Sequence, residues 1–123
     1  MADADTPSVV DLDAKFDQFD DHWAPRIVAT YNDNEVRLAK AAGDFQWHKH
    51  DETDELFLVI SGRLTIEFRD CKETLSPGQM IVVPRGVEHR PRANEGEVRM
   101  LIIDPKNTAN TGNHATATQA VKL

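Results

Sequence analysis

The feature of this sequence that most limits its fold is a series of short apolar segments, each closed by a turn signal. Turn-forming residues recur at Asn32-Asp33-Asn34, Ser61-Gly62, Ser76-Pro77-Gly78 and Pro84-Arg85-Gly86. Glycine, proline and asparagine are the residues that most readily reverse a chain. Strands are predicted between these turns, over residues 26–31, 35–41, 44–50, 55–60, 64–68, 72–75, 80–83 and 98–103. Many short strands with almost no helix predict an all-β sandwich or barrel.

The length of the chain, 123 residues, predicts one domain with a single core. We expect residues 1–25 to form an N-terminal arm, residues 26–105 the barrel, and residues 106–123 a C-terminal tail. The tail has no core-forming period, so it either wraps the barrel or is partly disordered. Leu12, Phe16 and Phe19 recur at helical spacing, which predicts a short helix in the arm that packs on the barrel.

Composition excludes some classes of partner. Acidic residues outnumber basic ones by 21 to 14, giving a formal net charge of −7, which argues against a nucleic-acid partner. No apolar run reaches the roughly 18 residues that a membrane helix needs, so no membrane partner is expected. Cys71 is the only cysteine, which excludes an intrachain disulfide. Together with an acidic N-terminus that lacks a secretory pattern, this predicts a cytoplasmic location.

Three histidines and one glutamate stand out as candidate metal ligands. His48 and His50 are two residues apart, so on a strand both side chains would leave from the same face. Glu55 lies at an odd offset from both, but the turn-prone residues 51–54 could absorb the change of face. A histidine pair of this kind also arises by chance on protein surfaces, so the wider pattern has to decide.

The wider pattern resembles the cupin superfamily over about residues 34–103. Gly43-x4-His48-x-His50-x4-Glu55-x6-Gly62 is similar to the first cupin motif, and Gly78-x5-Pro84-x-Gly86-x2-His89 to the second. The resemblance implies a jelly-roll barrel (a double-stranded β-helix) of roughly eight strands. It also implies that His48, His50, Glu55 and His89 bind one divalent first-row transition metal. Such a ligand set accepts Fe, Mn, Ni, Co, Cu or Zn.

A finer resemblance lies outside the motifs. The stretches around His22-Trp23-Ala24-Pro25 and Lys106-Asn107-Thr108 are similar to small single-domain bacterial cupins of a mannose-6-phosphate isomerase-like group, whose activity is not established. This resemblance therefore implies a fold and a metal rather than a particular reaction.

Alternation along the strands predicts which residues line a substrate pocket. Gln46 shares a face with His48 and His50, Phe57 shares one with Glu55, and Pro91 shares one with His89. We therefore expect a mostly apolar pocket with Gln46 as its polar candidate. On the last strand, either Val98, Met100 and Ile102 or the opposite face could line it.

A small-molecule ligand is the expected partner. The first interpretation is a metal-dependent enzyme of the oxygenase, isomerase or lyase type that acts on a small oxygen-rich molecule. The sequence identifies no general base and no catalytic residue, so enzyme status stays open. The alternative is a non-catalytic cupin that binds a sugar or another small molecule around a structural metal. A sugar-phosphate isomerase is a third possibility, but phosphate needs converging cations, and Lys49 and Arg85 are few.

An apolar stripe predicts a homodimer. Leu56, Leu58 and Ile60 face away from Glu55, and contiguous apolar surface favours association. The competing hypothesis is that residues 10–25 cover this stripe within one chain.

Overall fold

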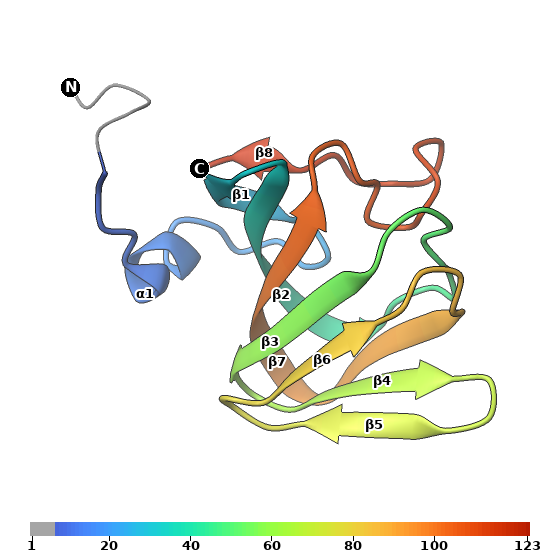
Figure 1. Cartoon of the computed structure of the whole chain (residues 1–123). Helices are drawn as coiled ribbons and strands as arrows, with labels where there is room; N and C mark the ends of the chain where they lie inside the picture. The colour runs from blue at the N-terminus through green and yellow to red at the C-terminus, as the bar shows by residue number, and fades with distance from the viewer. Residues whose placement is uncertain (1–6) are drawn as a thin grey trace.

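The computed structural model describes residues 7–123 as a barrel of strands with one short helix (Figure 1). The first six residues of the expected N-terminal arm lie outside this range. The elements follow the order α1 (Leu12–Phe16), β1 (Arg26–Tyr31), β2 (Asn34–Asp44), β3 (Glu55–Ser61), β4 (Leu64–Phe68), β5 (Lys72–Leu75), β6 (Met80–Val83), β7 (His89–Pro105) and β8 (Val121–Lys122). The prediction of an all-β fold is confirmed.

Strand β7 organises the sheet. The hydrogen-bonded order is β5-β4-β7-β2-β1-β8, while β3 pairs with both β6 and β7. The start of β7 pairs with β4, where His89 lies opposite Phe68. Its second half lies between β2 and β3, where Met100 is opposite both Ala39 and Val59. This strand of 17 residues therefore runs along both halves of the barrel, and the sequence pattern detected only its second half.

Alternate residues of the strands fill the barrel. Val98, Met100 and Ile102 of β7 are buried together with Phe57 and Val59 of β3. This arrangement decides the question that alternation left open, because it turns the Val98 face of β7 inward. It also confirms that Phe57 and Val59 share the inward face of Glu55.

The N-terminal segment covers part of the opposite face of the sheet. The helix α1 begins after Asp11, whose side chain accepts a hydrogen bond of 3.2 Å from the backbone N–H of Ala14, a common N-terminal cap. Phe16 and Phe19 are buried against Leu38, and Ile60 packs against the same cluster. The expected short helix is thus present, and the segment shields one end of the apolar stripe.

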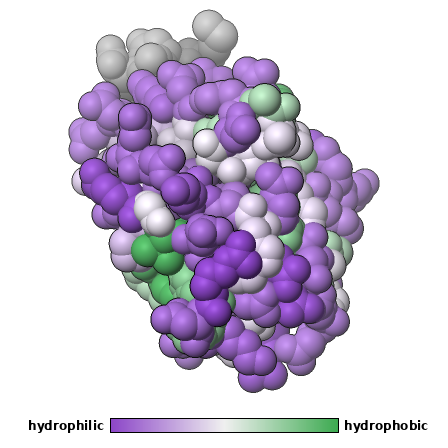
Figure 2. Space-filling model, turned by 90° about the vertical axis from the view of Figure 1, so that its right-hand side faces the viewer, coloured by the Kyte–Doolittle hydropathy of each residue, from purple (hydrophilic) through white to green (hydrophobic). Residues whose placement is uncertain are grey.

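The C-terminal tail wraps the barrel. Its strand β8 pairs in parallel with β1, with Val121 opposite Arg26. Asn110 fixes the middle of the tail, because its side-chain amide donates to the carbonyl of Trp23 at 3.2 Å and its side-chain oxygen accepts from the backbone N–H of Thr118 at 3.1 Å. The face shown in Figure 2 is mostly hydrophilic, with apolar side chains gathered at its lower left edge. No helix among residues 7–123 is long and apolar enough to span a membrane.

Candidate metal centre and its cavity

Four side chains that are distant in sequence meet inside one end of the barrel. His48 and His50 follow β2, Glu55 opens β3, and His89 opens β7. One nitrogen or oxygen from each of them lies within 4.8 Å of the others, and all four residues are buried. The structure thus brings the four sequence candidates together.

The backbone around these residues is irregular, although a strand was predicted over residues 44–50. Strand β2 ends at Asp44, and only His48 forms a bridge, opposite His89. In that bridge the N–H of His48 donates to the carbonyl of His89 at 3.0 Å, and the N–H of His89 donates back at 2.9 Å. The N–H of Gly86 donates to the carbonyl of His50 at 2.8 Å. These bonds tie the His48–His50 segment to the turn that leads into β7.

Hydrogen bonds fix the protonation of two of the imidazoles. Nδ1 of His48 lies 2.9 Å from the carbonyl oxygen of Gln46, and Nδ1 of His89 lies 2.9 Å from that of Val87. A carbonyl oxygen can only accept, so each Nδ1 carries the hydrogen and the neutral ring keeps a lone pair on Nε2. Burial lowers the pKa of His48 to about 4, which keeps its ring neutral near pH 7. This is the tautomer in which a histidine binds a metal through Nε2.

The inward atoms of the cluster lack protein partners. Nε2 of His50, Oε1 of Glu55 and Nε2 of His89 are buried without a hydrogen bond among the described residues. Oε1 of Glu55 lies 3.3 Å from Nε2 of His50 and 3.5 Å from Nε2 of His89. Burial acts to raise the pKa of Glu55, but the two imidazoles outweigh it, so this pKa lies below its usual value. Buried polar atoms are costly when unsatisfied, and a bound cation would satisfy all three. The donor set therefore fits a metal ion.

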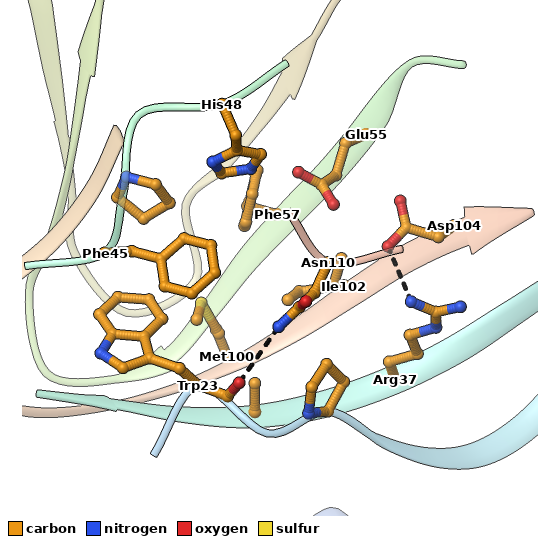
Figure 3. Close-up of a pocket in the computed structure, with 13 residues that line it drawn as sticks. Trp23, Arg37, Phe45, His48, Glu55, Phe57, Met100, Ile102, Asp104 and Asn110 are labelled. Atoms are coloured by element: carbon orange, nitrogen blue, oxygen red, sulfur yellow. Dashed lines mark hydrogen bonds and ion pairs between the residues drawn. The ribbon is translucent and has the colours of Figure 1, made fainter. Parts of the chain in front are cut away.

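A mostly apolar cavity adjoins the cluster on the side of His48 and Glu55 (Figure 3). Its empty volume is about 410 Å³ when the open mouth is included, and the interior is narrow. The lining side chains are mainly apolar: Trp23, Pro25, Ala39, Phe45, Phe57, Pro91, Met100 and Ile102.

Two of the three expected pocket residues line this cavity. Phe57 and Pro91 lie on its wall, whereas Gln46 is exposed and absent from it. The inward orientation of Gln46 is wrong because residues 45–47 are not a regular strand, so alternation from His48 does not apply. The adjacent Phe45 occupies the wall instead, with its ring 5.2 Å from that of His48.

Trp23 closes the cavity from the N-terminal segment. Its backbone has a φ of 58°, a left-handed conformation that is costly for a bulky residue. Its backbone N–H donates to the carbonyl of Lys40 at 2.8 Å, and its indole N–H donates to the carbonyl of Ala42 at 3.0 Å. The indole stacks on Phe45 with ring centroids 4.9 Å apart. The surrounding contacts thus hold a strained residue in place. Its position on the cavity wall was not predicted from the sequence.

An ion pair forms the polar end of the cavity. Nη1 of Arg37 lies 3.5 Å from Oδ2 of Asp104, and both side chains are buried. The guanidinium also donates to Glu35 at 2.7 Å and to the carbonyl of Thr108 at 2.9 Å. Burial and the nearby carboxylate of Glu55 raise the pKa of Asp104 well above its usual value, although Arg37 opposes them. Sequence reasoning missed Asp104, which continues the inward series of Val98, Met100 and Ile102.

The other basic candidates lie outside the cavity. Arg85 pairs with Asp54 at 3.3 Å, Arg90 with Glu67 at 2.6 Å, and Arg92 with Asp44 at 2.9 Å. Each of these three arginines is therefore engaged in an ion pair outside the cavity and does not supply a cation to it.

Comparison with known proteins places this architecture in a family. The cupin domain model matches residues 34–104, so the chain belongs to the cupin family, and the jelly-roll barrel that its motifs implied is confirmed. An uncharacterised protein of Bacillus subtilis, YdbB, is 39% identical over 77 residues, which are 61% of this chain and 67% of that protein.

Two solved structures share the fold over most of the chain. A cupin-2 domain protein from Shewanella frigidimarina is 47% identical with a TM-score of 0.78, covering 80% of this chain and 95% of that one. Protein NMB1881 from Neisseria meningitidis is 27% identical with a TM-score of 0.73, covering 80% of this chain and all of that one.

Proposed function

We propose that His48, His50, Glu55 and His89 hold one divalent first-row transition metal ion, and that the adjoining cavity binds a small oxygen-containing molecule. The observation that carries this proposal is the set of three inward nitrogen and oxygen atoms, on His50, Glu55 and His89, that are buried without a hydrogen bond. The neutral tautomers of His48 and His89 support it, because their lone pairs point away from the carbonyls that hold Nδ1. Fe, Mn, Ni, Co, Cu and Zn all remain candidates for such ligands.

We further propose a metal-dependent enzyme of the oxygenase, isomerase or lyase type. A bound metal would supply Lewis-acid polarisation of a substrate oxygen at the positions that the four side chains leave open. The apolar walls, which include Phe57 and Pro91, would exclude water from this site and hold the body of the substrate. The hydrogen bonds to Nδ1 of His48 and His89 would keep both rings oriented toward the centre.

Metal content tests the first proposal directly. Protein purified without an affinity tag should contain about one first-row metal ion per chain by elemental analysis, and His50→Ala should lose most of it while the barrel still folds. His114→Ala is the matched control, because this histidine is exposed in the tail and its loss should leave the metal content unchanged. Full metal content in the double variant His48→Ala/His50→Ala would refute the proposed ligands.

The alternative is a non-catalytic module that binds a small molecule around a structural metal. Screening of the metal-loaded protein for oxygen uptake and for isomerase or lyase turnover separates the two, since a binding module retains ligands without converting them. A mannose-6-phosphate isomerase-like activity has less support. Arg37 is the only cation on the cavity wall within the described chain, and it is already bonded to Glu35 and Thr108.

We also propose that the protein forms a homodimer through the outer face of β3 and β6. Leu56 lies opposite Val82 and Leu58 opposite Met80, and Ile103 adjoins Leu56 on the other side. Met80 is 55% exposed and Val82 47% exposed, while α1 covers only the Ile60 end of this face. A second copy of the same apolar face is the simplest two-fold partner. The cytoplasmic location stays a prediction from the sequence.

A further inference from the structure

We infer that Asp104 is the polar anchor for the ligand of the cavity, and that the part of the ligand that reaches it is an uncharged apolar body with a hydroxyl group. The inference rests on the proposed function, since it assumes a ligand that reaches from the metal cluster into the cavity. It adds the chemical class of that ligand and the residue that selects it.

One carboxyl oxygen of Asp104 has no hydrogen-bond partner, and the residue lies on the cavity wall, where a ligand can reach it. The residue is 1% exposed, and its Oδ1 is buried without a partner. Its carboxyl group lies beside that of Glu55 at the polar end of the cavity (Figure 3). A buried acceptor left unpaired is costly, so a ligand that donates to it should bind about tenfold more tightly than one that cannot.

The other polar side chains on the cavity wall, apart from the metal cluster, are already satisfied. Asn110 donates to the carbonyl of Trp23 and accepts from the N–H of Thr118. Arg37 donates hydrogen bonds from Nε and Nη2 to Glu35 and from Nη1 to the carbonyl of Thr108. Among the wall residues that the structure describes, Asp104 is therefore the one that a ligand has to satisfy.

The charges around Asp104 disfavour an anionic group at this end of the cavity. The carboxyl groups of Glu55 and Asp104 lie there together, and the single guanidinium is already paired with Glu35 at 2.7 Å and with Asp104 at 3.5 Å. A carboxylate or phosphate placed beside them would be repelled by Glu55 and would find no free side-chain cation. A hydroxyl group can instead donate to Oδ1 of Asp104 without bringing a charge.

The remaining walls define the rest of the ligand. The apolar part of the wall, made by Phe57, Pro91, Met100 and Ile102, favours the burial of alkyl or ring carbon atoms of a ligand. The cavity, about 410 Å³ with its open mouth, admits only a small molecule. A small hydroxyketone fits these requirements, because its two oxygens can serve the metal cluster and Asp104 while its methyl groups meet the walls.

Tryptophan fluorescence can report occupancy of this cavity. The chain has two tryptophans: Trp23 lines the cavity, and Trp47 stacks on Arg69 at 3.9 Å outside it. The variant Trp47→Phe therefore leaves a single reporter at the site. Zinc-loaded Trp47→Phe protein would be titrated with 3-hydroxy-2-butanone and with 2-butanone, which lacks the hydroxyl.

The preference between the two ketones is the decisive readout. We expect saturable binding of 3-hydroxy-2-butanone that is about tenfold tighter than that of 2-butanone. In Asp104→Leu this preference should drop about tenfold, whereas Asp104→Asn, which keeps an acceptor oxygen, should retain most of it. A purely structural defect would weaken both ketones equally. Asp70→Leu, at an exposed turn, is the matched control.

Each other outcome refutes a specific statement. An unchanged preference in Asp104→Leu, or no binding of 3-hydroxy-2-butanone to zinc-loaded protein, would overturn the role of Asp104. If Asp104→Leu does not fold, Asp104→Ala in the same titration gives the same decision. Failure of the protein to take up zinc would instead refute the proposed metal site, and elemental analysis of each sample keeps the two failures apart.

Discussion

Replacement of Gly112 by alanine should damage the metal site although this residue belongs to the tail. Gly112 has a φ of +75°, and a Cβ added to it would lie 1.9 Å from the carbonyl oxygen of Lys49 and 3.0 Å from its carbonyl carbon. Lys49 stands between His48 and His50. The added methyl group therefore meets the backbone that carries two candidate metal ligands.

The size of the effect follows from this geometry. Ordinary contact begins at 3.4 Å, so the two segments must separate by about 1.5 Å. A left-handed conformation costs alanine roughly 1–2 kcal/mol, and the overlap adds about 1–3 kcal/mol unless the tail lifts away. We expect a loss of about 2–5 kcal/mol in the free energy of unfolding, or a smaller loss with the tail displaced. Either response disturbs the His48–His50 segment, and disturbed support of metal ligands typically weakens binding by 10–100-fold.

Gly78→Ala is the matched control for this experiment. Gly78 has a φ of +84°, and nothing lies within 4 Å of an added Cβ, so this variant carries the conformational cost alone, about 1–2 kcal/mol. Urea unfolding measures the two stabilities, and competition with a chromogenic chelator measures the two zinc affinities. Equal stability and equal zinc affinity in Gly112→Ala and Gly78→Ala would refute the argument that the tail supports the metal site.

Three further predictions concern acid stability, assembly and secondary structure. The pKa of His48 is about 4 in the folded protein and 6.5 when the side chain is exposed, so the unfolded chain takes up the proton first as the pH falls. In metal-free protein, the free energy of unfolding of His48→Gln should therefore rise by about 3 kcal/mol relative to that of the wild type between pH 7 and pH 4. An equal difference between the two proteins in urea unfolding at both pH values would contradict this. Light scattering of the wild type should give twice the chain mass of 13.8 kDa. The variant Met80→Lys should halve this measured mass, whereas Cys71→Lys, at an exposed position, should leave it unchanged. A monomeric wild type would reject the dimer. Circular dichroism should show far less helix than the roughly one-third average of globular proteins.

The barrel and the grouping of the four candidate ligands could be predicted because both leave local marks in the sequence. Turn residues at Gly62, Gly78 and Gly86 divide the strands, and the resemblance to the two cupin motifs links the four candidate ligands. The predicted face of Phe57 also held, because β3 is a regular strand in which alternation applies. Gln46 failed for the opposite reason, since an irregular segment follows Asp44.

The sequence contains no comparable signal for the polar end of the cavity. Arg37 and Asp104 are 67 positions apart and meet only because β2 and β7 pair antiparallel, with Glu35 opposite Asp104. A charged residue at the end of an apolar strand usually faces solvent, so the sequence favours the wrong orientation for Asp104. The start of β7 was also missed, since Arg90, Arg92 and Asn94 give its first half a polar pattern although it pairs with β4.

One strand joins the two parts of the candidate site. His89 opens β7 and Asp104 lies next to its last residue, Pro105, so the candidate cluster and the polar wall of the cavity are attached to the same backbone. Because β7 is hydrogen-bonded to β2, β3 and β4, these two residues have little freedom to move apart. His48 and His50 lie on an irregular segment instead, and the tail packs against it at Gly112. The barrel therefore holds His89 and Asp104 in place, whereas the position of the His48–His50 segment depends on the tail.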